Sequence, residues 1–260
     1  MNTNGTRHET VSARAVCAFA DEPLAQEKSE DEARSVNSPI LLASSSPRRA
    51  HILQTLGVPF RIIQSAFEEP SPSAEDHARP ALFVEHLAGE KARAAQVRED
   101  EKRALVLSAD TIVWHDGEIL GKPQNPDAAI SMLRRLRGQE HRVYTGVCLR
   151  RVTNENIEYS NDHSDTYSMS HAVTTVSFND VSEGISDDWI RAYVATGEPM
   201  DKAGSYGAQD KGALLVRRID GDFWNVVGLP LAPLSKLLRE ASAPIEKIWG
   251  SRQKTEHSKQ

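Results

Sequence analysis

The stretch Ile40-Leu41-Leu42-Ala43-Ser44-Ser45-Ser46-Pro47-Arg48-Arg49 decides the fold class and carries the chain's most informative chemistry. Its apolar start predicts a buried strand, and Pro47 after a serine predicts the beginning of a helix. Two arginines follow in the first turn, where exposed N–H donors already provide a partial positive charge. This arrangement favours an anion site, most simply for phosphate, with Ser44 and Ser46 as further donors. A capped surface helix with solvated arginines is the alternative.

Composition limits the classes of protein to which the chain can belong. The 260 residues are 39% hydrophobic and 26% charged, which suits one sizeable domain or two small ones. No apolar run approaches membrane-spanning length. The formal net charge of -6 argues against broad nucleic-acid binding, so we expect any polyanion site to be a local pocket. Cys17 and Cys148 form neither a metal motif nor a disulfide framework, which is consistent with a cytoplasmic protein.

The polarity of the termini and of one internal segment predicts the domain boundaries. We expect a disordered leader over residues 1–37, one domain over 38–245, and a disordered tail over 246–260. The polar segment at about 154–170 interrupts two strand-like runs and predicts a surface insertion.

Hydrophobic periodicity inside the domain alternates between strand and helix, which predicts an α/β or α+β fold. The expected strands are 40–43, 59–65, 104–113, 142–150, 172–178 and 213–219, and the expected helices are 47–56, 80–97, 126–137, 187–196 and 230–240.

Asp110 lies near the end of the apolar strand 104–113. An unpaired carboxylate there would be costly to bury, so we expect a cation, a metal or strong donors beside it. A structural ion pair or a turn cap is the alternative to a catalytic role. Lys91 falls on the apolar stripe of the helix 80–97, where it either extends to solvent or supplies a cation to a cleft.

Three further segments carry charged groups in loops. Lys122 follows Gly121 in a Gly/Pro loop that is not a Walker A motif, because a proline follows the lysine. Glu68 and Glu69 end a strand-like run and either are solvated or share a magnesium ion with Asp110. The small-residue segment 201–209, which includes Lys202, allows the backbone to approach a ligand closely.

A family resemblance extends from about Pro39 to Arg239 and rests on motifs that occur in a fixed order. They are Ser44-Ser45-Ser46-Pro47-Arg48-Arg49, Glu68-Glu69, Glu90-Lys91-Ala92, Ala109-Asp110-Thr111, Gly121-Lys122-Pro123, Thr145-Gly146-Val147, Gly197-Glu198-Pro199, Asp201-Lys202-Ala203-Gly204-Ser205-Tyr206-Gly207 and Val227-Gly228-Leu229-Pro230-Leu231. Together they resemble the Maf family of nucleoside triphosphate pyrophosphatases.

The resemblance implies an α/β fold with an elongated mixed β-sheet flanked by helices and two lobes around a central cleft. It implies hydrolysis of a nucleoside triphosphate to the monophosphate and pyrophosphate, with Asp110 as proton acceptor. Arg48, Thr111 and Gln209 match positions that separate the family's branches, and this combination is similar to the branch acting on dTTP and UTP. Asp210, which follows Gln209, departs from the glycine common in the family.

These considerations define the expected site. We expect catalytic roles for Asp110, Lys91, Lys122 and Glu68, and a divalent cation, Mg²⁺ or Mn²⁺, on Asp110 and Glu68. We expect substrate to be bound and selected by the residues Arg48, Thr111, Gln209, Ser44, Ser46 and Lys202.

The expected partner is a nucleoside triphosphate, without nucleic acid or membrane, and a homodimer is left open. The enzyme would limit incorporation of unwanted nucleotides. Two alternatives are the same chemistry on a modified or purine nucleotide, such as 7-methyl-GTP, and a non-catalytic nucleotide-binding regulator of cell division.

Overall fold

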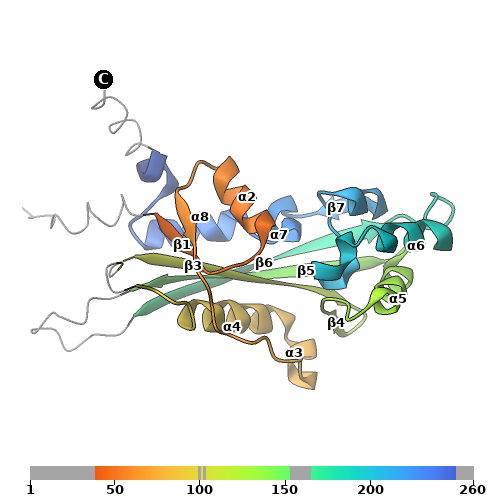
Figure 1. Ribbon diagram of the computed structural model, residues 1–260, viewed down its shortest axis with the longest axis horizontal. Coiled ribbons are helices and arrows are strands. Elements are labelled where there is room, and N and C mark those ends of the chain that lie inside the picture. The colour runs from red at the N-terminus through yellow and green to blue at the C-terminus, as the bar shows by residue number, and fades with distance from the viewer. Residues whose placement is uncertain (1–38, 99–100, 102–103, 153–164, 250–260) are drawn as a thin grey trace, which may run out of the picture.

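The sheet is built around strand β3 (Leu105–His115), which pairs on one side with two different strands at its two ends. The computed structural model describes residues 39–98, 101, 104–152 and 165–249. Its mixed sheet has the order β2-β1-β3-β5-β6-β7, with β4 paired to β3. The other strands are β1 (Ile40–Leu42), β2 (Phe60–Ile62), β4 (Glu118–Leu120), β5 (Glu140–Arg151), β6 (Thr166–Phe178) and β7 (Val216–Asp220). Strand β1 runs parallel to β2 and β3, and the remaining pairs are antiparallel (Figure 1).

One face of the sheet is covered by α4 (Pro80–Arg93), which α3 (Ala74–Ala78) precedes (Figure 1). The apolar side chains of α4 pack against alternate residues of β3 and β5, among them Ile112 and Tyr144. Ser108 lies on the same face of β3 and donates to the Ala88 carbonyl at 2.6 Å. The period of two along β3 therefore directs Asp110 towards α4, as the alternation predicts.

The opposite face carries two separate cores at its two ends, which form the two lobes (Figure 1). In the first, α2 (Pro47–Thr55), α7 (Phe223–Val227) and α8 (Leu231–Glu240) pack on β1, β3 and β5. In the second, α5 (Pro126–Leu136) and α6 (Asp187–Ala195) pack around Phe178 of β6. Three short 3-10 turns, η2 (Glu198–Asp201), η3 (Ala203–Ser205) and η4 (Lys211–Leu215), follow α6. The described part of the chain contains no helix long and apolar enough to cross a bilayer.

The α/β class, the mixed sheet and every expected strand and helix are confirmed, with shifted boundaries. Helix α4 ends at Arg93 instead of residue 97, because the chain leaves it to form a bridge between Ala95 and Ser65. The elements that periodicity did not predict are short ones, namely β4, α3, α7 and the 3-10 turns.

Two boundary predictions are wrong. Residues 166–170, expected in a polar insertion, belong to β6, where they pair with β5. Residues 246–249, expected in a disordered tail, are helical, and the Trp249 indole donates to the Leu56 carbonyl at 2.7 Å. The expected leader over 1–37, the centre of the expected insertion (153–164) and residues 250–260 lie outside the described residues.

Gly146 of β5 sets how closely α4 approaches the sheet. It lies opposite Asp110 in the register between β3 and β5. A Cβ atom at this position would overlap the Val84 carbonyl group of α4 and lie 2.8 Å from the Glu85 nitrogen. Only glycine therefore lets this helix lie flat on the strands beside Asp110.

We predict that Gly146→Ala destabilises the protein by about 1–3 kcal/mol, because the added methyl group pushes α4 off the sheet. Urea unfolding followed by circular dichroism measures the loss. Gly121→Ala is the matched control, since no atom lies within 4 Å of the Cβ it would add. Equal stability of Gly146→Ala and the unmodified protein would contradict this account of the packing.

Candidate active site

A cavity of about 740 Å³ opens at the edge of β3 between the two lobes. Strand β1 pairs with β3 at Val106 and Leu107, and β4 pairs with it only from Val113 onward. In the described residues, the stretch of β3 between these pairings has no neighbouring strand on that side. Side chains from both faces of β3 therefore reach the same hollow, and both Asp110 and Thr111 line it.

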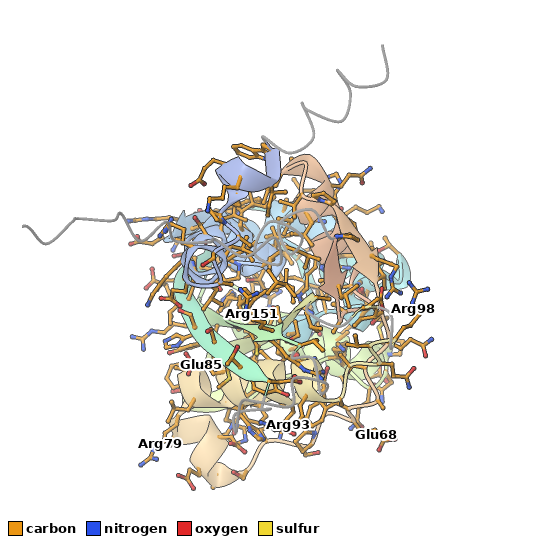
Figure 2. The ribbon with its side chains drawn as sticks, turned by 90° about the vertical axis from the view of Figure 1, so that its left-hand side faces the viewer. Glu68, Arg79, Glu85, Arg93, Arg98 and Arg151 are labelled. Carbon is orange, nitrogen blue, oxygen red and sulfur yellow. The ribbon has the colours of Figure 1, made fainter. Side chains whose placement is uncertain are left out.

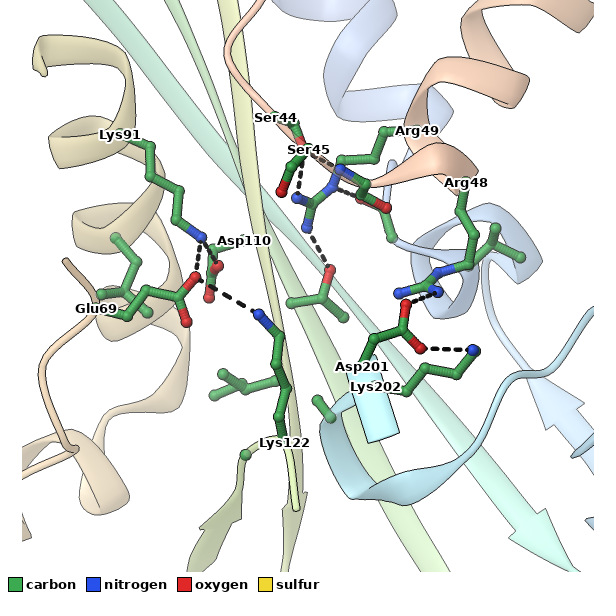
Figure 3. Close-up of a pocket in the computed structure, with 18 of the residues that line it drawn as sticks. Ser44, Ser45, Arg48, Arg49, Glu69, Lys91, Asp110, Lys122, Asp201 and Lys202 are labelled. Carbon is green, nitrogen blue, oxygen red and sulfur yellow. Dashed lines mark hydrogen bonds and ion pairs between the residues drawn. The ribbon is translucent and has the colours of Figure 1, made fainter. Parts of the chain in front are cut away.

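On the α4 side, the Lys91 ammonium lies between two carboxylates (Figure 3). Its Nζ donates to Asp110 Oδ1 and, at 2.5 Å, to Glu69 Oε1. Lys122 approaches the same Glu69 oxygen at 4.0 Å. Asp110 is only 6% exposed, so the cation expected beside it is Lys91.

Burial raises the pKa of Asp110 above its ordinary value, and the negative charge of Glu69 adds to the rise while Lys91 and Arg49 oppose it. Glu69 behaves differently. Burial disfavours its charged form, but the charge and hydrogen bond of Lys91, together with Lys122, hold its pKa below the usual range. Neighbouring carboxylates with pKa values pushed in opposite directions are typical of catalytic sites.

On the other side of β3, the Arg49 guanidinium is buried among neutral oxygens (Figure 3). It donates to the Gly228 carbonyl at 2.8 Å, to Ser44 Oγ at 3.0 Å and to Thr111 Oγ1 at 3.1 Å. Among the described residues that line the cavity, it is the cation that has no carboxylate within ion-pair distance. Burial lowers the pKa of Arg49, since the charged form lacks a direct counterion.

The direction of one hydrogen bond follows from proton counting. Thr145 donates its hydroxyl proton to the Asn225 carbonyl at 2.8 Å. The 3.0 Å bond between Thr145 and Thr111 must therefore be donated by Thr111, which in turn accepts from Arg49. Thr111 has no proton left to donate to a ligand, so its hydroxyl orients Arg49 and can only accept further bonds.

The two lobes are joined across the cavity by Asp201. This carboxylate accepts from Arg48 of α2 at 3.1 Å and from Lys202 at 2.8 Å. Lys202 is itself buried, and its Nζ also donates to the Glu198 carbonyl at 2.7 Å. An incoming anion would compete with Asp201 for both cations.

The serine turn before α2 does not use the Ser46 side chain to cap the helix. Ser46 occupies the N-cap position of α2 but makes no side-chain capping bond. Its backbone N–H instead donates to Ser44 Oγ at 3.2 Å. Pro47 begins the helix as predicted.

The structure brings together nine of the ten expected site residues in this cavity, which are Ser44, Ser46, Arg48, Lys91, Asp110, Thr111, Lys122, Lys202 and Gln209. Glu68 is the exception. It is exposed, does not line the cavity and lies at the periphery of the molecule (Figure 2). The structure does not bring Glu68 together with Asp110, and its neighbour Glu69 lies there instead, joined to Asp110 through Lys91.

The sequence does not indicate the roles of two further cavity residues, Arg49 and Asp201, and it draws attention to Asp210, which lies outside the cavity. Arg49, which is absent from the expected substrate-binding residues, is more deeply buried than Arg48 and reaches Thr111. Asp201 was not singled out as a bridging carboxylate. Asp210, which departs from the family pattern, does not line the cavity.

The cavity as a whole is positive. Five cationic side chains line it (Arg48, Arg49, Lys91, Lys122 and Lys202) against three carboxylates (Glu69, Asp110 and Asp201). Such a surplus in a partly buried site suits a ligand with several negative charges. Together with a buried carboxylate of raised pKa, it defines a site for reaction at a polyphosphate.

Comparison with known proteins agrees with this class of site. Residues 39–241 match the family model described as Maf-like protein, and the chain belongs to this family. It is 46% identical over 213 residues to a protein of Moorella thermoacetica named dTTP/UTP pyrophosphatase, covering 82% of this chain and 98% of the relative. A protein of the same name from Salinibacter ruber is 46% identical over 212 residues, covering 81% and 94% of the two chains.

We predict that Arg49→Gln weakens binding of inorganic tripolyphosphate about ten- to hundredfold, because it removes the buried cation that no carboxylate compensates. Arg48→Gln is the matched control and should weaken binding less, since Arg48 is paired with Asp201. Isothermal titration calorimetry measures both, with circular dichroism to verify folding. A larger loss for Arg48→Gln than for Arg49→Gln would contradict this assignment.

Proposed function

We propose that the protein is a nucleoside triphosphate pyrophosphatase that hydrolyses dTTP and UTP to the monophosphate and pyrophosphate. The observation that carries this proposal is the buried Asp110–Lys91 pair within a cavity lined by five cationic side chains. Two 46%-identical relatives named dTTP/UTP pyrophosphatase support the same activity.

The triphosphate would occupy the region between α2 and Lys91. Arg49, Ser44 and the open N–H groups of α2 offer donors on one side, and Lys122 and Lys91 offer cations on the other. On binding, substrate oxygens would replace Glu69 as the partner of Lys91 and Lys122. They would likewise replace Asp201 as the partner of Arg48 and Lys202. The same groups then stabilise the negative charge that develops on pyrophosphate as it leaves.

Asp110 is the proposed general base. Water attacks the α-phosphorus, the bond to the bridging oxygen of pyrophosphate breaks, and the proton of the attacking water passes to Asp110. Its raised pKa makes it a stronger base than an ordinary aspartate, and Lys91 holds the carboxylate in place.

The donor set fits a divalent cation such as Mg²⁺ or Mn²⁺. The carboxylates of Asp110 and Glu69 both contact the Lys91 ammonium, so they lie close enough to bind one cation. Because no cluster of three or more metal-binding side chains occurs in the described residues, phosphate oxygens and water would have to complete the coordination. When bound, the cation would polarise the phosphate and acidify water.

We assign selection of the nucleobase to Gln209. Thr111 would act mainly through its hydrogen bond with Arg49. Gln209 is exposed and lines the cavity in the segment after Gly207. Its amide offers both a donor and an acceptor, so it can recognise the C4 oxygen of thymine or uracil, where cytosine carries an amino group. We further propose that the enzyme acts on free nucleotides in the cytoplasm and limits incorporation of unwanted ones.

We predict that the purified protein with Mg²⁺ releases pyrophosphate from dTTP and UTP faster than from CTP, ATP or GTP, as measured with a coupled pyrophosphate assay. Asp110→Asn should lower kcat for dTTP about 10²–10⁴-fold, because the general base is lost. Equal rates on all nucleotides would refute the specificity. Tight dTTP binding without pyrophosphate release would favour a non-catalytic regulator instead.

The adjacent residues Glu68 and Glu69 allow the proposed metal ligand to be tested against a matched control. We predict that Glu69→Gln raises the Mg²⁺ concentration needed for half-maximal activity, because one proposed ligand is removed. Glu68→Gln should leave it unchanged, since Glu68 is exposed and outside the cavity. Titration of activity against Mg²⁺ tests both, and a shift in Glu68→Gln alone would reverse the assignment.

A further inference from the structure

Backbone hydrogen bonds hold the 207–212 segment in place on both sides of Gln209. On one side, the backbone N–H of Gly207 donates to the Tyr193 hydroxyl oxygen at 3.2 Å. On the other, the N–H groups of Lys211 and Gly212 donate to the Glu198 carboxylate at 3.2 and 3.0 Å. Only residues 208–210 lie between these anchors.

The two anchoring side chains are themselves joined. The Tyr193 hydroxyl donates to Glu198 Oε1 at 2.9 Å. Tyr193 is 4% exposed on α6, and burial raises its pKa, so it remains a donor throughout the physiological range. Burial opposes ionisation of Glu198, but the hydrogen bonds from Gly212, Tyr193 and Lys211 outweigh it and hold its pKa below the usual range.

Gly212 is required by this close fit, and Gly207 lies close to Lys202. A Cβ atom on Gly212 would overlap the Tyr193 hydroxyl and lie 2.7 Å from the Gly207 carbonyl oxygen. A Cβ atom on Gly207 would lie 2.8 Å from Lys202 Cε and 3.4 Å from Glu198 Oε1. The chain thus closes a tight loop around the Tyr193–Glu198 pair.

Glu198 also acts on the opposite side of the loop. Its backbone carbonyl accepts from Lys202 Nζ at 2.7 Å, so one residue fixes both a proposed phosphate contact and the segment with the proposed base contact. Ala208, next to Gln209, packs against the core of the second lobe. Neither Tyr193 nor Glu198 lines the cavity.

We propose that Tyr193 and Glu198 are positioning residues for base selection, which hold the 207–212 segment so that Gln209 meets the pyrimidine in one fixed orientation. This inference rests on the proposed function. A substrate-selecting side chain on a loop discriminates only if the loop is rigid, because a mobile amide can adapt to the wrong base.

The test compares kcat/KM for dTTP with kcat/KM for CTP in the full-length enzyme. Tyr193→Phe keeps the ring in the core but removes the acceptor for Gly207 and the donor to Glu198. Glu198→Gln keeps the shape and weakens the anchoring of residues 211 and 212. For each we expect the dTTP preference over CTP to fall about tenfold, mainly through KM for dTTP, with little change in the rate for CTP.

Gln209→Ala supplies the decisive comparison. If the pair acts through Gln209, the double variant Tyr193→Phe/Gln209→Ala should have the same dTTP/CTP ratio as Gln209→Ala alone. Tyr144→Phe is the control for loss of a buried tyrosine hydroxyl, because Tyr144 is buried on the α4 side and does not line the cavity. It should leave the ratio unchanged.

The possible failures are distinguishable. The inference would be overturned if variants of Tyr193 and Glu198 lowered kcat/KM for dTTP and CTP equally. It would also be overturned if they lowered the dTTP/CTP ratio further in the absence of Gln209. Either result would leave the proposed function standing. A wild-type enzyme that does not distinguish dTTP from CTP would instead contradict the proposed specificity, and with it the discrimination that these residues are proposed to support.

Discussion

The ion pair between Lys91 of α4 and Asp110 of β3 is the interaction on which the site depends. A carboxylate buried this deeply is costly unless a cation and hydrogen bonds accompany it. The required cation comes from a helix on one face of the sheet, and it arrives only because Gly146 lets the backbone of that helix approach the neighbouring strand. Packing and electrostatics thus constrain each other: burial raises the pKa of Asp110, and Lys91 offsets only part of that rise.

Most of the other charged side chains in the cavity form ion pairs in which a carboxylate occupies a cation that a polyphosphate would bind. Glu69 accepts from Lys91, and Asp201 links Arg48 to Lys202 across the two lobes. These contacts limit the repulsion among cations before substrate binds. Arg49 differs, because its partners are neutral oxygens and its charge remains available to an anion. The family match and the dTTP/UTP pyrophosphatase relatives agree with a site of this kind.

Much of the fold and most of the site could be predicted from local patterns, and the errors have physical causes. The start of β6 has the polarity of a loop because none of residues 166–170 is fully buried, so no apolar alternation marks this part of the strand, as Ser168 and Ser170 illustrate. Glu68 was preferred to Glu69 because both lie in an irregular segment, where no period indicates which side chain faces inward. Arg48 and Arg49 are neighbours on a helix and point about 100° apart, so their different roles depend on what surrounds α2.

Local sequence patterns specify which chemical groups the protein carries and how each sits on its own helix or strand. They place Pro47 at a helix start, Asp110 on an apolar strand and Lys91 on the inner stripe of a helix, because caps and periodicity act over a few residues. Which of these groups come into contact depends on the packing of the whole domain. The gap on the edge of β3 opens because β1 ends before β4 begins, and it lets both faces of one strand contribute to one cavity. That convergence depends on contacts between residues far apart in the chain, which no local pattern encodes.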